Sequence, residues 1–356
     1  HGERREVTAP VSLIVTAFAP VADVRRTRTP QLRTDLGDTD LILIDLGKGR
    51  NRIAGSALAQ VHKQVGHHAP DLDDPHAMKS FFAAIRELMR EELVIAYHDR
   101  SDGGLFATLC EMAFAGHTGI DVQLDGLVEG GGEDPVAALF AEELGAVIQV
   151  LHCDTDTVLD ILRGYGFARH SHVIGTHEDD DRIRIAFGSE MLLDEARADL
   201  QRAWSETTYR MQALRDNPEC ARQEFDLLLD RQDPGIRIKL NFDPEDNVAA
   251  PMINRGARPR MAILREQGVN GQIEMAAAFT RAGFECVDVH MSDILGGRVA
   301  LSGFKGFVAC GGFSYGDVLG AGQGWAKSIL FNGQARDEFA AFFARSDSFG
   351  LGVCNG

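Results

Sequence analysis

The residues best suited to covalent chemistry form the motif Gly352-Val-Cys-Asn-Gly356, a G-x-C-x-G directly after an apolar stretch. A nucleophile on a sharp strand-to-helix turn needs small residues two places to either side, because the strained backbone would otherwise clash with its neighbours. Such a turn presents the sulfur of Cys354 at the carboxyl end of a strand, where a thiolate can attack a carbonyl. The alternative is a cysteine packed at a strand end as a small hydrophobe. We favour the nucleophile for Cys354 and expect the packing role for the other five cysteines.

A second candidate segment, Cys310-Gly-Gly-Phe-Ser-Tyr-Gly-Asp317, follows the preceding predicted strand of the same sheet. Adjacent glycines allow backbone N–H groups to point into a crevice, as an oxyanion hole requires. A glycine-rich turn that binds nothing is the alternative. Because of their position relative to Cys354, we expect Gly311 and Gly312 to contribute to the same site.

Three features of the first half have residue types that can bind an ion or a phosphate. The loop His98-Asp-Arg-Ser-Asp-Gly-Gly104 lies between a predicted strand, 93–97, and a predicted helix, 105–114. Lys48, in the turn Gly47-Lys-Gly49, could approach a phosphate, but the turn lacks the glycine spacing and the Ser or Thr of a P-loop, so we expect a solvated lysine. The histidines at 67, 68, 170 and 172 lack the spacing of metal ligands, and we expect them to be solvated as well.

The elements that must position the first-half residues alternate irregularly between strand and helix. A β-rich opening is expected at 8–24, strands at 41–45, 93–97, 146–151, 171–175 and 182–186, and helices at 56–65, 75–89, 105–114, 136–144, 155–163 and 194–214. The helix that begins at Pro75 carries one apolar stripe that we assign to the core: Met78, Phe81, Phe82, Ile85, Leu88 and Met89. Adjacent strands with interspersed helices predict an α+β fold.

From Arg260 the pattern changes to a regular alternation. Short apolar strands are predicted at 261–264, 284–289, 306–310 and 349–353, with helices at 272–282 and 337–344. A β-α-β order with crossover helices is typical of a doubly wound parallel sheet. The sequence therefore predicts a second, α/β part that carries Cys354.

Length and composition restrict the class of protein. The 356 residues suffice for two or three domains, and 44% hydrophobic residues suffice for their cores. A formal charge of −17 makes nucleic acid an unlikely partner, and no apolar run reaches the ~20 residues of a membrane span. Six cysteines without a CxxC pair favour a reducing cytoplasm. The first residues resemble no signal peptide and include no initiator Met, so we expect a piece of a longer chain.

The glycine segment and the cysteine motif together resemble a known family. Gly311-Gly-Phe-Ser-Tyr-Gly-Asp-Val-Leu-Gly-Ala-Gly322, then Gly324-Trp-Ala-Lys-Ser-Ile-Leu330 and Gly352-Val-Cys-Asn-Gly356, resemble the class I (triad) glutaminase domain of the phosphoribosylformylglycinamidine synthase family. Four upstream segments resemble the second synthetase half of its large single-chain form: Leu43-Ile-Asp-Leu-Gly-Lys-Gly49, Tyr97-His-Asp-Arg-Ser-Asp-Gly-Gly-Leu105, Glu142-Glu-Leu-Gly-Ala146 and Trp204-Ser-Glu-Thr-Thr208. The resemblance covers essentially the whole chain.

The resemblance implies a multidomain α/β and α+β architecture. Residues 1–34 would be the end of the synthetase N-terminal-like subdomain and a linker, and 35–214 an aminoimidazole-ribonucleotide-synthetase-like α+β domain. Residues 215–258 would be a second linker. Residues 259–356 would be the first half of a doubly wound class I glutaminase domain, truncated after the nucleophile.

The resemblance also implies an activity. The parent enzyme would be a cytoplasmic carbon–nitrogen ligase of purine biosynthesis that converts formylglycinamide ribonucleotide, glutamine, ATP and water to formylglycinamidine ribonucleotide, glutamate, ADP and phosphate. Cys354 would be the nucleophile, with the backbone N–H groups of Gly311, Gly312 and Asn355 as oxyanion donors. Asp99 would bind Mg²⁺, which a hard carboxylate suits, and Ser101 would contact ATP or ADP at a site that is auxiliary rather than catalytic. Capping of the helix at Leu105 is the alternative role of Asp99 and Ser101.

The chain departs from the family pattern in one respect that bears on activity. The family's His and Glu follow the cysteine far downstream, and we find no motif that makes His290 a substitute. We therefore expect the chain to need the remainder of the same polypeptide and to be inactive alone. Two other functions stay open: a non-catalytic nucleotide-binding scaffold, and another cysteine hydrolase of glutaminase-like fold.

Overall fold

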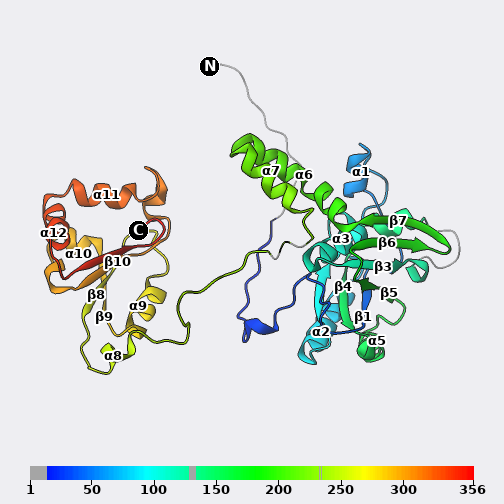
Figure 1. Ribbon diagram of the computed structural model, residues 1–356, viewed down its shortest axis with the longest axis horizontal. Helices are drawn as coiled ribbons and strands as arrows, with labels where there is room; N and C mark the ends of the chain where they lie inside the picture. The colour runs from blue at the N-terminus through cyan, green and yellow to red at the C-terminus, as the bar shows by residue number, and fades with distance from the viewer. Residues whose placement is uncertain (1–13, 128–133, 232, 234) are drawn as a thin grey trace, which may run out of the picture. The chain divides into compact units, whose positions relative to one another are not determined.

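The computed structural model describes residues 14–127, 134–231, 233 and 235–356, and it divides the chain into two compact units, residues 1–235 and 236–356 (Figure 1). Of the predicted β-rich opening, 8–13 lies outside the described residues. The remainder was predicted wrongly, because the described residues before Thr39 contain a single 3₁₀ turn, Val24–Arg26, and no strand. The side chains of Ile14 and Phe18 are both 92% exposed, so these apolar residues pack against no sheet.

The first unit is built on a mixed sheet of seven strands in the order β2-β4-β1-β5-β3-β6-β7. All neighbours pair antiparallel except β3 and β6, which are parallel. The strands are β1 (Thr39–Asp45), β2 (Ala96–Asp99), β3 (Gly119–Gln123), β4 (Gly145–Leu151), β5 (Ser171–Glu178), β6 (Arg182–Phe187) and β7 (Glu190–Ala196). The predicted α+β class is confirmed.

Helices cover both faces of this sheet, and two separate cores result. Alternate residues of β1 face opposite ways: Leu41 and Leu43 pack with α3 (Gly104–Gly116), whereas Ile42 and Ile44 pack with α2 (Pro75–Arg90) and α5 (Thr155–Gly164). This alternation follows from the period of two in a strand. Every residue of β1 is buried, as expected of a strand covered on both sides. Packing on both faces therefore holds β1, and with it the loop that follows its carboxyl end, in place within the unit.

Several predicted helices differ from the observed ones. The helix α1 (Ala57–Val61) ends well before Val65, and Val61 and Val65 are each 77% exposed, so their helical spacing marks no core face. Helix α4 (Pro135–Phe140) is shorter than predicted, and Phe82 of the α2 stripe is 63% exposed. The helix predicted from Asp194 begins at Arg197, because β7 occupies Asp194.

Two helices follow the sheet of the first unit. Helix α6 (Arg197–Arg215) is followed by α7 (Pro218–Leu227), where the sequence indicated only a polar linker. The two helices pack through Tyr209 and Phe225, whose rings stack with centroids 4.4 Å apart. The guanidinium of Arg202 lies 4.1 Å from the centre of the same Phe225 ring. These contacts explain how a segment with few apolar residues holds a helix.

The second unit contains a four-stranded sheet that is parallel throughout, in the order β11-β10-β8-β9. Its strands are β8 (Arg260–Arg265), β9 (Glu285–His290), β10 (Gly306–Ala309) and β11 (Phe349–Gly352). Counted within the unit, the spatial order is 2-1-3-4, which is that of flavodoxin-like doubly wound sheets. The predicted parallel sheet is confirmed, and its topological switch point lies between β8 and β10.

Helices flank both faces of this second sheet. One face packs on α9 (Gln272–Arg281) through Met275, Ala276 and Phe279. The other face packs on α10 (Met291–Leu295), α11 (Gln323–Leu330) and α12 (Gly333–Phe343), with Phe307 at the centre of an aromatic cluster. A four-residue helix, α8 (Ala250–Ile253), precedes β8. The carboxyl ends of all four strands meet at one edge, which is where ligands bind in such sheets.

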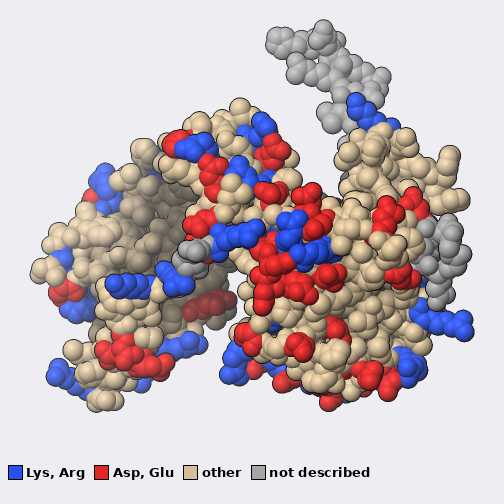
Figure 2. Space-filling model, turned by 45° about the vertical axis from the view of Figure 1, so that its right-hand side comes forward, with Lys and Arg blue, Asp and Glu red and all other residues tan. Residues whose placement is uncertain are grey.

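The charged surface and the lengths of the apolar helices can be compared with what the sequence predicts. On the face shown in Figure 2, Lys and Arg side chains lie among Asp and Glu side chains. Within the described ranges, no helix combines the length and apolar character that crossing a membrane requires.

Candidate active site

Cys354 lies at a strained turn directly after β11. Its φ is +55°, in the left-handed region that a non-glycine residue seldom adopts. The flanking glycines are required by space: a Cβ on Gly356 would lie 2.1 Å from the carbonyl oxygen of Ala309, and a Cβ on Gly352 would lie 2.9 Å from that of Gly356. Cys354 is exposed. The geometry predicted for G-x-C-x-G, a strained turn that presents the thiol, is therefore present.

The glycines that follow β10 lie beside this cysteine. A Cβ on Gly311 would lie 3.1 Å from the Cβ and 3.9 Å from the Sγ of Cys354. Gly312 has φ +127°, and a Cβ there would lie 2.3 Å from the carbonyl oxygen of Gly268. The N–H of Asn270 donates to the carbonyl of Gly311 at 3.0 Å. The loops after β8 and β10 are thus joined across the switch point, next to the thiol.

Three backbone donors near the thiol have no acceptor in the described part of the chain. The N–H groups of Gly311, Gly312 and Asn355 donate to none of its backbone or side-chain oxygens. Such donors are what a developing oxyanion needs. The structure brings these three residues together with Cys354, although their catalytic role stays a prediction.

The side chain of Asn355 holds the glycine segment in place, a role that sequence reasoning missed. Asn355 is 5% exposed, and its amide donates to the carbonyl of Gly312 at 3.0 Å and to Oδ1 of Asp317 at 2.6 Å. Its Oδ1 accepts from the N–H of Gly322. Tyr315 and Asp317 have φ values of +58° and +53°, so the bonds of Asn355 fix a strained loop. An Asn next to a glycine carries no such signal in sequence.

Candidate bases lie elsewhere at this edge of the sheet. His290 ends β9, and β10 and β8 separate that strand from β11, so His290 stands three strand spacings, about 14 Å, from the cysteine strand. Its ring contacts Ser292 at 2.9 Å and Glu266 at 3.7 Å. Tyr315 bonds Ser328 at 2.8 Å, and burial raises the pKa of its phenol. Cys354 makes no side-chain hydrogen bond to any described residue, so this part of the chain supplies it with no base.

Asp99 and Ser101 lie in the first unit, in the loop between β2 and α3. Asp99 is the last residue of β2, with a side chain 68% exposed and an oxygen 3.7 Å from Nδ1 of His98. Its charge, after burial, contributes to a pKa of about 12 for Tyr97. Ser101 is exposed, and its carbonyl accepts from the N–H of Gly104 at 3.0 Å.

Neither residue caps the following helix. The N-cap position of α3 is Gly103, which has φ +81° and whose N–H donates to the carboxylate of Glu142 at 2.8 Å. A Cβ on Gly104 would lie 2.7 Å from the carbonyl oxygen of Leu139, so glycine is required there as well. The alternative that Asp99 and Ser101 act as caps is wrong, because Glu142 takes that role. Both side chains are left exposed to solvent.

The residues around Asp99 do not by themselves fit a Mg²⁺ site. Within the described ranges, no three His, Cys, Asp or Glu side chains lie close enough to share a metal ion. Mg²⁺ prefers six oxygen ligands, of which this loop offers one exposed carboxylate. As an exposed carboxylate, Asp99 is suited to supply one ligand of an ion held chiefly by phosphate.

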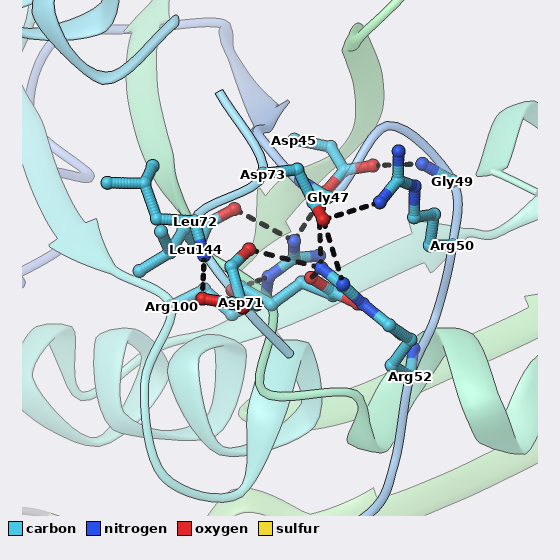
Figure 3. Close-up of polar contacts among 11 residues, drawn as sticks. Asp45, Gly47, Gly49, Arg50, Arg52, Asp71, Leu72, Asp73, Arg100 and Leu144 are labelled. Carbon is cyan, nitrogen blue, oxygen red and sulfur yellow. Dashed lines mark hydrogen bonds and ion pairs between the residues drawn. The ribbon is translucent and has the colours of Figure 1, made fainter. Parts of the chain in front are cut away.

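Buried ion pairs hold the loop after β1, and sequence reasoning did not identify them (Figure 3). The carboxylate of Asp45 pairs with Arg100 and accepts from the N–H groups of Gly47 at 3.0 Å and Gly49 at 2.7 Å. Glu143 has a side chain 1% exposed and binds Arg52 through both oxygens, at 2.6 and 2.8 Å. Since Arg52 also reaches Asp73, the network joins three segments of the first unit.

Two families match the chain, one within each of its two compact units. Residues 40–188 match the C-terminal domain of AIR synthase related proteins, and residues 258–356 match the CobB/CobQ-like glutamine amidotransferase domain. The first match covers most of the mixed sheet and the second covers the whole parallel sheet with the cysteine turn.

Several solved structures are similar to parts of this chain at low identity. PurL of Thermotoga maritima complexed with FGAR is 18% identical over 50% of this chain and 30% of its own, with a TM-score of 0.43. PurLQS of the same organism is 17% identical over 45% of this chain and 25% of its own, with a TM-score of 0.36. The hydrogenase maturation protein HypE of E. coli is 20% identical over 48% of this chain and 52% of its own, with a TM-score of 0.35. The chain thus spans less than a third of the PurL chains that it matches.

The two family matches follow one another in the order that the predicted resemblance requires. An AIR synthase-related domain precedes an amidotransferase domain whose strained cysteine stands at the carboxyl edge of a parallel sheet. The chain thus carries an AIR synthase-related C-terminal domain followed by a CobB/CobQ-like glutamine amidotransferase domain, and the two matches together support the resemblance to the phosphoribosylformylglycinamidine synthase family.

Proposed function

We propose that the second unit hydrolyses glutamine and that the parent protein passes the ammonia to a synthetase that makes formylglycinamidine ribonucleotide. The observation that carries the proposal is the left-handed turn at Cys354 with Gly311 directly beside it, inside a domain of the amidotransferase family. The first unit, of AIR synthase-related type, is the part that uses ATP.

In the glutaminase reaction, the sulfur of Cys354 attacks the carboxamide carbon of glutamine. A carbon–sulfur bond forms and the carbonyl electrons move to oxygen, where the N–H groups of Gly311, Gly312 and Asn355 receive the charge. The carbon–nitrogen bond then breaks, ammonia leaves with a proton, and water hydrolyses the thioester to glutamate. The base that takes the thiol proton lies outside the described contacts of Cys354.

In the synthetase reaction, ATP activates the amide oxygen of formylglycinamide ribonucleotide and ammonia replaces the activated oxygen. The products are formylglycinamidine ribonucleotide, ADP and phosphate, which makes the whole enzyme a cytoplasmic ligase of purine biosynthesis. We assign to Ser101 a nucleotide contact and to Asp99 one ligand of a phosphate-bound Mg²⁺ ion, both at an auxiliary site. Their exposure at the end of β2 supports this role.

The test uses the full-length parent protein, with and without the substitution Cys354→Ala. Synthesis of formylglycinamidine ribonucleotide is measured with glutamine and, separately, with ammonium chloride. We expect the variant to lose the glutamine-dependent reaction and to keep the ammonia-dependent one. If the wild-type protein shows neither reaction, the assignment fails and the first unit is a nucleotide-binding scaffold.

The 356-residue chain should itself show no glutaminase turnover, because Cys354 has no base among its described neighbours. Glutamate release from glutamine measures this directly. Turnover that disappears in Cys354→Ala would show that a residue of this chain serves as the base.

A further inference from the structure

We propose that the carboxylate of Glu266 selects the substrate of the second unit, by binding the α-ammonium group of glutamine while Cys354 attacks the carboxamide. The inference rests on the proposed glutaminase activity and names a residue that recognises the amino-acid end of the substrate. Glu266 directly follows β8, at the switch point of the parallel sheet, where ligands bind in folds of this kind.

The register of the sheet places Glu266 level with the nucleophile. One residue from each of three adjacent strands stands in register: Leu264 of β8, Ala309 of β10 and Gly352 of β11. Glu266 and Cys354 each follow two residues after the member on their own strand, so both lie at the same carboxyl edge. Because two strand spacings separate β8 from β11, the backbone positions of Glu266 and Cys354 are about 10 Å apart.

This separation fits the length of a glutamine molecule. Four single bonds join the carboxamide carbon to the α-nitrogen and span about 5 Å when extended. The contact between the attacking sulfur and the carbon occupies about 3 Å, and the bond between an ammonium and a carboxylate occupies about 3 Å as well. The substrate and its two contacts therefore reach about as far as the distance between Glu266 and Cys354.

The carboxylate of Glu266 has no permanently charged partner in the described part of the chain. Its side chain is 11% exposed, and it pairs with no Lys or Arg there. The basic group that approaches it is Nε2 of His290, at 3.7 Å, and an imidazole carries no permanent charge. The similarly buried carboxylates of Asp45 and Asp181 each bind an arginine. A little-exposed carboxylate without such a cation favours a positively charged group from a ligand.

Neutral donors hold Glu266 in place and leave its charge uncompensated. The N–H of Gln267 donates to Oε1 at 2.9 Å. Burial and a hydrogen bond to Glu266 raise the pKa of Tyr315, so the phenol stays protonated as a donor. Tyr315 belongs to the same glycine segment as Gly311, which lies beside Cys354. A carboxylate has about four acceptor positions, so Glu266 can still accept from an ammonium group.

The test compares two ligands of the full-length parent protein: glutamine, and 4-carbamoylbutanoate, which lacks only the α-amino group. Synthesis of formylglycinamidine ribonucleotide gives the KM for glutamine and the inhibition constant of 4-carbamoylbutanoate against glutamine. We expect Glu266→Gln to raise the KM for glutamine about 10- to 100-fold with kcat nearly unchanged, as the loss of a hydrogen bond between charged groups implies. The inhibition constant of 4-carbamoylbutanoate should not rise, because this ligand has no ammonium group.

Glu285→Gln is the matched control, since it removes one carboxylate, with a side chain 58% exposed, from the amino end of β9 in the same sheet. Its KM for glutamine should equal that of the wild type. Synthesis from ammonium chloride, which bypasses the glutamine site, should persist in both variants and shows that both fold.

The outcomes separate this inference from the proposed function. A wild-type KM for glutamine in Glu266→Gln would overturn the inference, and so would an equal loss of affinity for glutamine and 4-carbamoylbutanoate, because Glu266 would then only support the loop. Both results would leave the glutaminase activity of Cys354 intact. A wild-type protein without glutamine-dependent synthesis would overturn the proposed function and, with it, the role of Glu266.

Discussion

The turn that presents Cys354 depends on the absence of a side chain two residues away. A Cβ on Gly356 would meet the carbonyl oxygen of Ala309 at 2.1 Å, so alanine there must displace the turn or the strand end. We expect Gly356→Ala to destabilise the second unit by about 1–3 kcal/mol, the usual cost of overpacking. Alkylation of Cys354 by iodoacetamide, followed by mass spectrometry, should change in rate as the thiol moves.

Gly333 offers a matched control for this substitution. It begins α12 in the same unit, and a Cβ there would have no neighbour closer than 3.9 Å. Gly333→Ala should leave both the stability and the alkylation rate unchanged or slightly improve the stability. A loss of stability in Gly333→Ala equal to that in Gly356→Ala would contradict the steric argument.

The side chain of Asn355 makes a second prediction at the level of one residue. Asn355→Ala leaves the N–H of Gly322 and the carbonyl of Gly312 without this partner in a nearly buried place. We expect a loss of about 1–3 kcal/mol in the unfolding free energy of the second unit, measured by urea denaturation. Asn355→Asp should not restore it, because a carboxylate cannot donate to Asp317. Gln323→Ala, at an exposed position of the same unit, should have no effect.

The strained turn at Cys354 could be predicted from the sequence, whereas the hydrogen bonds of Asn355 could not. The glycines of G-x-C-x-G follow from backbone geometry, which depends on neighbours in the chain. Asn355 instead binds residues 33 to 43 positions away, and nothing in its own segment marks that distance. The same holds for Asp45 and Arg100, which are 55 residues apart.

Among the elements, the loop between β1 and α2 is held by the pairing of Arg52 with Glu143. Arg52→Ala would leave a carboxylate that is 1% exposed without its cation. Removal of one partner of a buried pair costs about 3–5 kcal/mol. Urea denaturation of the first unit should show that loss. Arg50→Ala is the control, because Arg50 pairs with the same Asp73 from a side chain 51% exposed, and its loss should be close to unmeasurable.

The sequence predicted the elements whose apolar pattern is strong and missed those whose partners lie far away. Strands β1, β4 and β8 are apolar runs with buried residues, and each was predicted within two residues of its bounds. Strand β7 carries Glu190, Asp194 and Glu195 and was read in part as a helix, since its stability comes from pairing with β6 rather than from burial. Strand β3, in which buried Ile120 and Val122 alternate with exposed Asp121 and Gln123, was also missed.

At the scale of the whole molecule, each unit has its own cores, one on each face of its sheet, and its own buried thiol. Cys110 lies in the core around α3, and burial raises its pKa to about 12 from an ordinary value of 9.0. Cys310 lies in the core around α9, and burial raises its pKa as well. Because the folded state favours the neutral thiol, the contribution of Cys110 to stability is complete below pH 9 and is lost as the pH rises towards 12.

These two thiols can therefore report the unfolding of each unit separately. At pH 8, brief iodoacetamide pulses along a urea series should label exposed Cys153 and Cys220 at every concentration, and Cys110 and Cys310 only where their own unit has unfolded. Arg52→Ala should shift the labelling of Cys110 to lower urea and leave that of Cys310 in place, whereas Asn355→Ala should do the reverse. If either substitution shifted the labelling of both thiols together, the two units would unfold as one, and the assignment of the Arg52 ion pair and of the Asn355 hydrogen bonds to separately unfolding units would be wrong.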